Sequence, residues 1–193
     1  VRNSFFEAYK DGDYKKAIVL GNKLLQIYAE NDDCDCIEYA VDMSNLAMVF
    51  DRLQLYPQAE KYYKQAAELK KRCGGESLSY ADTLNNLAIV YNQTNRQTEA
   101  LRLHRKVLEI REAKLGREHA DFLHSLYHIG NTYELLGEYD KAIDYHAMAL
   151  RNNTFSTLEL ADVHGALARA YEAKGNYKKA IYYYCLLYTS PAH

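Results

Sequence analysis

The chain has 193 residues, of which 48% are hydrophobic and 26% are charged, a composition typical of globular proteins. Its 24 basic and 26 acidic residues leave a net charge of −2, so nothing in the charge balance indicates binding to nucleic acid or to an anionic membrane surface. No apolar run approaches the roughly 20 residues of a membrane span, and no signal peptide opens the chain. We therefore expect a cytoplasmic protein with no nucleic-acid or membrane partner.

A pattern of small and aromatic residues recurs along the chain. In one copy, Leu46 and Ala47 precede Phe50, Tyr56 and Ala59. The same slots hold Leu87, Ala88, Tyr91, Gln97 and Ala100, then Ile129, Gly130, Tyr133, Tyr139 and Ala142, and finally Leu167, Ala168, Tyr171, Tyr177 and Ala180. Measured at the small second residue, these copies are 41, 42 and 38 residues apart, and a weaker copy precedes them. A period of this length predicts stacked repeats, each burying its apolar face against its neighbours.

Each copy predicts two helices joined by a tight turn. After the weaker first copy, the expected pairs are 37–53 with 56–73, 78–94 with 97–114, 119–136 with 139–152, and 157–174 with 177–188. The first helices end at Gly12, Asn95, Gly137 and Gly175, residues that tolerate the left-handed conformation closing such a turn. Gln54 fills this slot in the second repeat, so we expect that turn to be less tightly closed.

These elements predict an all-α fold, an α-solenoid of about five helix-turn-helix repeats. We expect one domain over residues 1–187, with repeats at about 1–30, 37–73, 78–114, 119–152 and 157–187. Residues 188–193 abandon the pattern and are interpreted as an irregular tail, either a fragment end or a non-native scar. Because Val1 already lies inside a repeat, we interpret the chain as a fragment of a longer protein.

The four cysteines do not predict a disulfide framework. Cys34 and Cys36 form one close pair, whereas Cys73 and Cys185 stand alone near expected helix ends. A zinc site requires two such pairs. We therefore expect free thiols in a reducing cytoplasm and no metal.

Two segments carry a resemblance to a known family. The string from Thr83 to Tyr91, Thr-Leu-Asn-Asn-Leu-Ala-Ile-Val-Tyr, and the junction from Ile110 to Asp121 resemble the tetratricopeptide repeat. The spacing near 42 is similar to the longer repeats of its kinesin-light-chain-type branch, although Ala120 stands where those proteins typically carry proline. The resemblance covers about residues 3–187. It implies a right-handed superhelix whose first helices line a concave groove that binds a peptide or a helix.

Three asparagines are the preferred candidates for groove contacts, namely Asn45, Asn86 and Asn131. A carboxamide both donates and accepts, so it can pair with the main chain of a bound peptide. In peptide-binding members of the family, asparagines at the slots of Asn45 and Asn86 do this work; the alternative is that these side chains cap a helix or face water. The other groove candidates are Met48, Arg52, Asn85, Ile89, His124, Tyr127, His128 and Arg169.

These other candidates have different expected roles. Met48, Ile89 and Tyr127 would supply apolar contacts. Arg52 and Arg169 would anchor acidic groups of a ligand, or pair with acidic neighbours inside the molecule.

His124 and His128 lie one helical turn apart, which is the spacing of metal ligands. Neither has the adjacent glutamate of a zinc-protease helix, so we interpret them as groove-lining or structural residues and keep a metal-dependent enzyme as a weak alternative. No catalytic triad, carboxylate pair or phosphate-binding loop is present in the sequence, so we expect no enzyme activity and no cofactor.

The sequence thus predicts a protein–protein interaction scaffold that binds a peptide or helical segment of a partner protein in its groove. The alternative is a peptide-sensing regulatory arm of a larger signalling or transcription-regulating protein. Both hypotheses name a protein or peptide as the ligand, and they differ in whether an effector domain is attached.

Overall fold

Residues 1–30, 35–151 and 156–189 are the part of the chain that the computed structural model describes. This part contains ten helices and no strand, which confirms the all-α prediction. The helices are α1 (Arg2–Lys10), α2 (Tyr14–Ala29), α3 (Cys36–Arg52), α4 (Tyr56–Gly74), α5 (Leu78–Gln93), α6 (Gln97–Leu115), α7 (Ala120–Leu135), α8 (Tyr139–Ala149), α9 (Thr157–Ala173) and α10 (Tyr177–Thr189). None of the helices described here combines the length and hydrophobicity that crossing a membrane requires.

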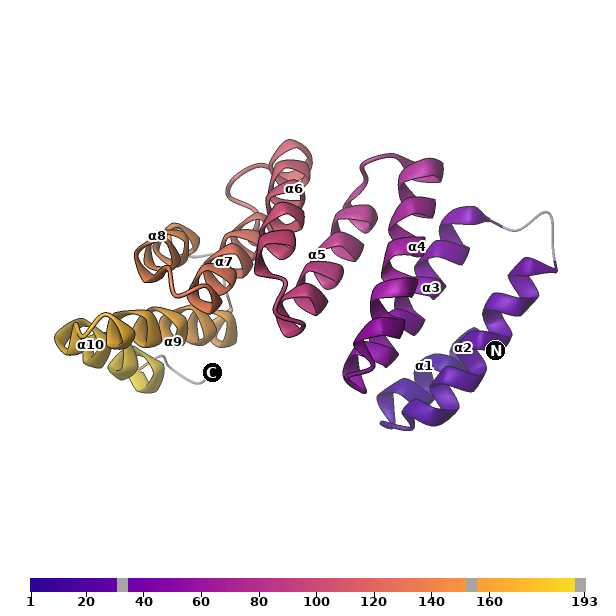
Figure 1. Ribbon diagram of the computed structural model, residues 1–193, viewed down its shortest axis with the longest axis horizontal. Helices are drawn as coiled ribbons and strands as arrows, with labels where there is room; N and C mark the ends of the chain where they lie inside the picture. The colour runs from indigo at the N-terminus through magenta and orange to yellow at the C-terminus, as the bar shows by residue number, and fades with distance from the viewer. Residues whose placement is uncertain (31–34, 152–155, 190–193) are drawn as a thin grey trace. The chain divides into compact units, whose positions relative to one another are not determined.

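The helices belong to two units, Val1–Asn95 with α1 to α5 and Arg96–His193 with α6 to α10. Within each unit every helix packs on the next, so consecutive helices lie side by side (Figure 1). Two first helices also touch in each unit, α3 with α5 and α7 with α9. This nearest-neighbour packing is that of a repeat protein. The single domain over residues 1–187 stays a prediction.

The turns between paired helices close through a residue in the left-handed conformation. Gln54 and Asn95 adopt φ angles of 58° and 59°, close to the values of 73–75° at Gly12, Gly137 and Gly175. The next residue then donates back across the turn, as in Leu55 N to Phe50 O at 2.9 Å. The expectation of a looser turn at Gln54 is therefore wrong, because this backbone hydrogen bond is formed despite the less favourable residue.

Helix starts at the repeat junctions are fixed by side-chain caps. Asp35 accepts from Ile37 N at 2.7 Å, and Ser77 accepts from Tyr80 N at 3.3 Å. Ser156 and Glu159 form a reciprocal capping box at the start of α9. Such caps satisfy backbone N–H groups that a helix leaves without a partner. Helix α10 extends to Thr189, so residues 188 and 189 are helical, and the remainder of the expected tail lies outside the described residues.

Alanine and paired rings hold the two helices of a repeat together. Ala17, Ala59, Ala142 and Ala180, whose hairpins each lie within one unit, are all buried, as a close approach of the two helices requires. Three hairpins also stack one ring from each helix, with centroid distances of 5.4–5.7 Å: Phe50 on Tyr62, Tyr133 on Tyr145, and Tyr171 on Tyr183. The tyrosines of these three pairs are thus packing residues, since aromatic ring pairs add stability beyond the area they bury.

The expectation of free thiols is wrong for two of the four cysteines. Cys36 at the start of α3 and Cys73 near the end of α4 form a disulfide. The two helices run antiparallel, which brings these residues, 37 positions apart in sequence, to the same end of one hairpin. Their separation in the sequence alone does not predict that Cys36 and Cys73 lie close together. Cys185 is exposed, and Cys34 lies outside the described residues.

Candidate functional site

The first unit contains a pocket of about 440 Å³ on α3 and α5. Four predicted groove residues line it together: Met48, Arg52, Asn86 and Ile89. The remaining lining residues are Asp51, Gln54, Tyr56, Tyr63 and Gln93. Met48 and Ile89 are half-buried, so each offers part of an apolar side chain to the pocket. The pocket therefore combines apolar, carboxamide and charged groups contributed by two successive repeats.

Asn86 has a partner inside the protein. Its carboxamide hydrogen-bonds to the hydroxyl of Tyr63, a fully buried residue of α4 whose pKa is raised chiefly by burial. Asn86 itself is half-buried. A carboxamide has two donor hydrogens and an acceptor oxygen, so one bond to Tyr63 leaves further capacity for a ligand. Tyr63 thereby fixes the orientation of the Asn86 side chain.

Charge in this pocket is balanced. Asp51 and Arg52 are adjacent in α3, and burial raises the pKa of Asp51 while the Arg52 charge opposes that rise. Arg52 Nε donates to the hydroxyl of Tyr9 at 3.3 Å, which also raises the pKa of Arg52. Arg52 is thus tethered to α1 rather than hydrogen-bonded to its acidic neighbour. Its exposed guanidinium retains donors that can bind a carboxylate.

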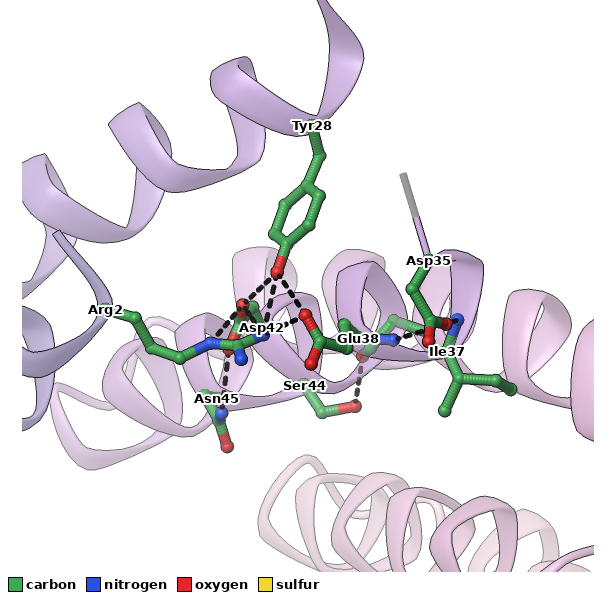
Figure 2. A network of polar contacts seen from close by, with 9 residues as sticks. Arg2, Tyr28, Asp35, Ile37, Glu38, Asp42, Ser44 and Asn45 are labelled. Carbon is green, nitrogen blue, oxygen red and sulfur yellow. Dashed lines mark hydrogen bonds and ion pairs between the residues drawn. The ribbon is translucent and has the colours of Figure 1, made fainter. Parts of the chain in front are cut away.

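Asn45 lies apart from this pocket, beside the buried carboxylate of Asp42. Figure 2 shows Arg2 and Tyr28 converging on Asp42, with Arg2 Nη2 at 2.6 Å and the Tyr28 hydroxyl at 3.0 Å from Oδ2. The Asn45 amide donates to Asp42 Oδ1 at 3.5 Å. This network joins α1, α2 and α3, and it raises the pKa of Arg2, while burial above all raises that of Tyr28 to about 12. The amide of Asn45 is therefore partly engaged in a structural contact.

Asn85 does not face the groove. It is only 8% exposed, although it was expected on the open side of its helix. It lies three residues before Ala88, which is fully buried, and residues three apart share one face of a helix. Asn85 therefore turns toward the packed side of α5.

The second unit brings together its own predicted residues between α7 and α9. His124, Tyr127 and His128 line a pocket of about 190 Å³ with Glu159, Asp162 and Val163. Asn131 and Arg169 line a neighbouring pocket of about 670 Å³ with Glu134, Leu135, Tyr139, Glu172 and Ala173. Glu159 was not among the predicted residues, although its place in a Ser-x-x-Glu capping motif was visible in the sequence.

Arg169 is paired across the repeat junction. Its Nε and Nη2 donate to the two carboxylate oxygens of Glu134 at 2.9 and 3.4 Å, and this contact raises the pKa of Arg169. Glu172, the acidic neighbour on its own helix, instead accepts from Tyr184 at 2.8 Å. The fork geometry resembles the way arginine binds a free carboxylate. Part of its binding capacity is thus used inside the protein.

The two histidines of α7 have different surroundings. His124 Nε2 lies 2.9 Å from Glu159 Oε1, whereas the ring of His128 stacks on that of His104 with centroids 5.5 Å apart. Burial lowers the pKa of His128 to about 4, so its ring is neutral at physiological pH. Across the described residues, no group of three histidine, cysteine or acidic side chains is placed to hold a metal ion.

Comparisons with known proteins agree with the repeat fold. The tetratricopeptide repeat model matches residues 6–72, 43–113, 79–154 and 121–189. The fold is similar to BtubC (BKLC) from P. vanneervenii, at 24% identity over 91% of this chain and 72% of that one, with a TM-score of 0.81. It is also similar to a putative kinesin light chain with nearly identical TPR-like repeats from Podosopora anserina, at 20% identity over 96% and 90%, with a TM-score of 0.79.

A third similar structure is a Rap protein, at 18% identity and a TM-score of 0.76. The alignment covers 97% of this chain but 51% of that one. None of the curated proteins matches the chain by sequence. The family model, however, covers nearly all of the chain in four overlapping segments. The chain belongs to the tetratricopeptide repeat family.

Proposed function

We propose that this protein is a protein-binding module that captures a peptide or helical segment of a partner on the groove side of its first helices. The observation that carries the proposal is the pocket shared by Met48, Arg52, Asn86 and Ile89. These residues come from two repeats, and the sequence pattern predicts all four as groove residues. Tetratricopeptide repeat scaffolds serve protein–protein interaction, which fits such a surface.

The chemistry of the pocket suits a polypeptide ligand. Half-buried Met48 and Ile89 provide apolar contact, while Asn86 can exchange hydrogen bonds with a main-chain N–H and C=O. The structure of the similar Rap protein was determined in complex with Competence and Sporulation Factor, which supports a ligand-binding role for the fold. No described feature calls for a bound cofactor in this proposal, and we propose none.

The test begins with peptides selected on the wild-type protein from a display library of short random sequences. Replacing Asn86 with alanine should weaken their binding by about 1–3 kcal/mol, because polar groups of the ligand then lose their partner. The variant should also lose about 1 kcal/mol of folding stability, since buried Tyr63 loses a hydrogen bond.

Gln65→Ala is the matched control, because it removes an exposed carboxamide of α4 that lies outside the pocket. It should bind the selected peptides with nearly wild-type affinity. Equal affinity of wild type and Asn86→Ala would contradict the proposed site. So would a failure to select any peptide.

A further inference from the structure

The smaller pocket of the second unit has two chemically distinct walls. Helix α7 contributes the aromatic side chains of Tyr127 and His128, together with His124. Helix α9 contributes the carboxylates of Glu159 and Asp162. The rings of Tyr127 and His128 lie 5.7 Å apart with their planes tilted by 56°. An open pocket of about 190 Å³ with aromatic groups on one side and carboxylates on the other is suited to a cation.

The two carboxylates of the pocket, Glu159 and Asp162, differ in their contacts with other residues of the protein. Glu159 Oε2 accepts from Ser156 N at 2.6 Å, and its Oε1 lies 2.9 Å from His124 Nε2. The Ser156 hydrogen bonds lower the pKa of Glu159, so this carboxylate is held charged and in place. Asp162 is exposed and forms no hydrogen bond or ion pair with any side chain in the described part of the chain. Its negative charge is therefore available to a ligand.

His128 contributes no positive charge to the α7 wall of the pocket. That ring is held against His104, with interplanar angle 4°, and burial keeps it neutral at physiological pH. An anionic ligand group would meet two carboxylates here, whereas a cationic group would meet an aromatic wall and an unpaired carboxylate. The pocket thus favours positive charge.

The neighbouring pocket on the same two helices extends this preference. Among the described residues that line the two pockets, Glu134, Glu159, Asp162 and Glu172 carry negative charge, against the guanidinium of Arg169. Arg169 is already paired with Glu134. In the first unit, by contrast, the lining contains one aspartate and one arginine, Asp51 and Arg52. The acidic excess is thus a feature of the second unit's groove.

We propose that the pocket between α7 and α9 binds a lysine or arginine side chain of the partner polypeptide. This inference rests on the proposed peptide-binding function and specifies the charge of the segment that is bound. Asp162 forms an ion pair with the basic group of the ligand. Tyr127 offers an aromatic surface to the aliphatic part of the ligand side chain and to its charged end. Glu159 adds to the negative electrostatic potential of the pocket. Carboxylates arranged in this way attract basic partners and repel acidic ones.

The test uses fluorescein-labelled versions of the peptides selected on the wild-type protein. We expect the selected sequences to be enriched in lysine or arginine, and Asp162→Asn to weaken the basic peptides about fivefold. Asp144→Asn is the matched control, because it removes another exposed aspartate, one that lies on α8 outside both pockets. Replacing the peptide's basic residue with norleucine should abolish the difference between wild type and Asp162→Asn, since the two changes remove the same contact.

Two results would overturn this inference. One is a set of selected peptides without enrichment in basic residues, and the other is equal binding by Asp162→Asn and Asp144→Asn. If such peptides still depend on Asn86, the proposed function stands and only the cation pocket fails. If no peptide is selected at all, both proposals fail together. The thermal melting temperature of each variant, expected to match wild type because both aspartates are exposed, separates lost binding from lost folding.

Discussion

The ammonium group of Lys70 donates to Thr83 Oγ1 at 2.8 Å, joining the end of α4 to the middle of α5. One repeat later, Arg111 Nη1 donates to Ser125 Oγ at 3.0 Å, joining α6 to α7. Each cation also reaches a backbone carbonyl one turn before the hydroxyl, that of Ser79 at 3.3 Å or of Asp121 at 3.0 Å. The same polar contact therefore recurs at two repeat junctions.

A variant of this contact stands at the preceding junction. Tyr28 and Asp42 occupy the corresponding positions and hydrogen-bond to each other. Tyr28 lies eleven residues after Ala17 of α2, as Lys70 lies eleven after Ala59 of α4, and Asp42 lies five residues before Ala47 of α3, as Thr83 lies five before Ala88 of α5. At the α8–α9 junction the second slot holds Val163, which packs in an apolar cluster with Leu126 and Leu167. A buried polar side chain at these positions costs free energy unless it forms its hydrogen bond. The contacts therefore favour the one register between neighbouring repeats in which the two partners lie together.

The first prediction concerns the pH dependence that Lys70 imposes. Burial lowers its pKa to about 8, whereas the unfolded chain keeps a value near 10.5. Between these values the unfolded state binds more protons, so stability should rise with pH, by up to about 3 kcal/mol. Lys70→Met should lack this rise when urea unfolding is compared between pH 7 and pH 10. The exposed control Lys61→Met should retain it, and an identical pH profile for wild type and Lys70→Met would contradict the assignment.

The second prediction compares two helical glycines. A Cβ at Gly130 would lie 2.5 Å from the ring of His146, which is fully buried, so Gly130→Ala should cost about 1–3 kcal/mol through overpacking. A Cβ at Gly165 would meet only the end of Arg169 at 3.6 Å. Gly165→Ala should therefore be neutral or stabilising by up to about 1 kcal/mol, since alanine favours the helix. Urea unfolding of both variants checks this; equal effects would show that the contact with His146 is not restrictive.

The third prediction concerns acid sensitivity. Burial lowers the pKa of His104 to about 3 and that of His146 to about 4, while unfolded histidine titrates near 6.5. Below pH 6.5 these histidines bind protons in the unfolded state but not in the folded state, so the free energy of unfolding should fall as the pH drops toward 4. His104→Leu should lose less stability than wild type over this range, by about 3 kcal/mol. Unfolding at pH 7 and pH 4 provides the measurement, and parallel losses in both proteins would argue against a neutral buried His104.

The fourth prediction concerns the disulfide between Cys36 and Cys73. It closes a loop with a sequence separation of 37, so reduction should cost roughly 4 kcal/mol by loss of the constraint on the unfolded chain. Non-reducing peptide mapping should recover the two cysteines in one linked product, and Cys73→Ser should match the reduced protein in stability. Recovery of both cysteines as free thiols from protein kept under air would contradict the pairing. Because disulfides are rare in reducing compartments, this result also tests the expected cytoplasmic location.

The repeat pattern predicted helix positions well for a physical reason. Each helix buries the same small and aromatic slots, so the expected and observed limits of α5 and α7 differ by one residue at most at each end. Contacts that join different parts of the chain were harder to foresee. The disulfide depends on antiparallel packing of α3 and α4, and the Lys70–Thr83 bond depends on junction geometry. The Lys70–Thr83 bond could have been inferred by aligning the repeats, because polar residues recur at the same buried positions, as Arg111 and Ser125 do one repeat later.

The candidate site was predictable where helical geometry alone decides. Asn86 and Ile89 lie three residues apart and both reach one pocket. Asn85, however, is buried, because its neighbour in space is Ala88. Partners inside the protein could not be foreseen from one helix: Tyr63 for Asn86, Glu134 for Arg169 and Asp42 for Asn45 all come from another helix or from a preceding turn. Acidic enrichment of the second unit's groove likewise emerges only when α7 and α9 are side by side.

The central claim is that a partner polypeptide lies against the α3–α5 pocket, and photo-crosslinking tests it most directly. A photo-reactive amino acid is introduced in place of Ile89, which lines the pocket, or in place of Gln65, which is exposed on α4 outside it. After irradiation with a selected fluorescent peptide, we predict a crosslinked product at position 89 and none at position 65. Crosslinking that is equal at both positions, or confined to position 65, would contradict the account.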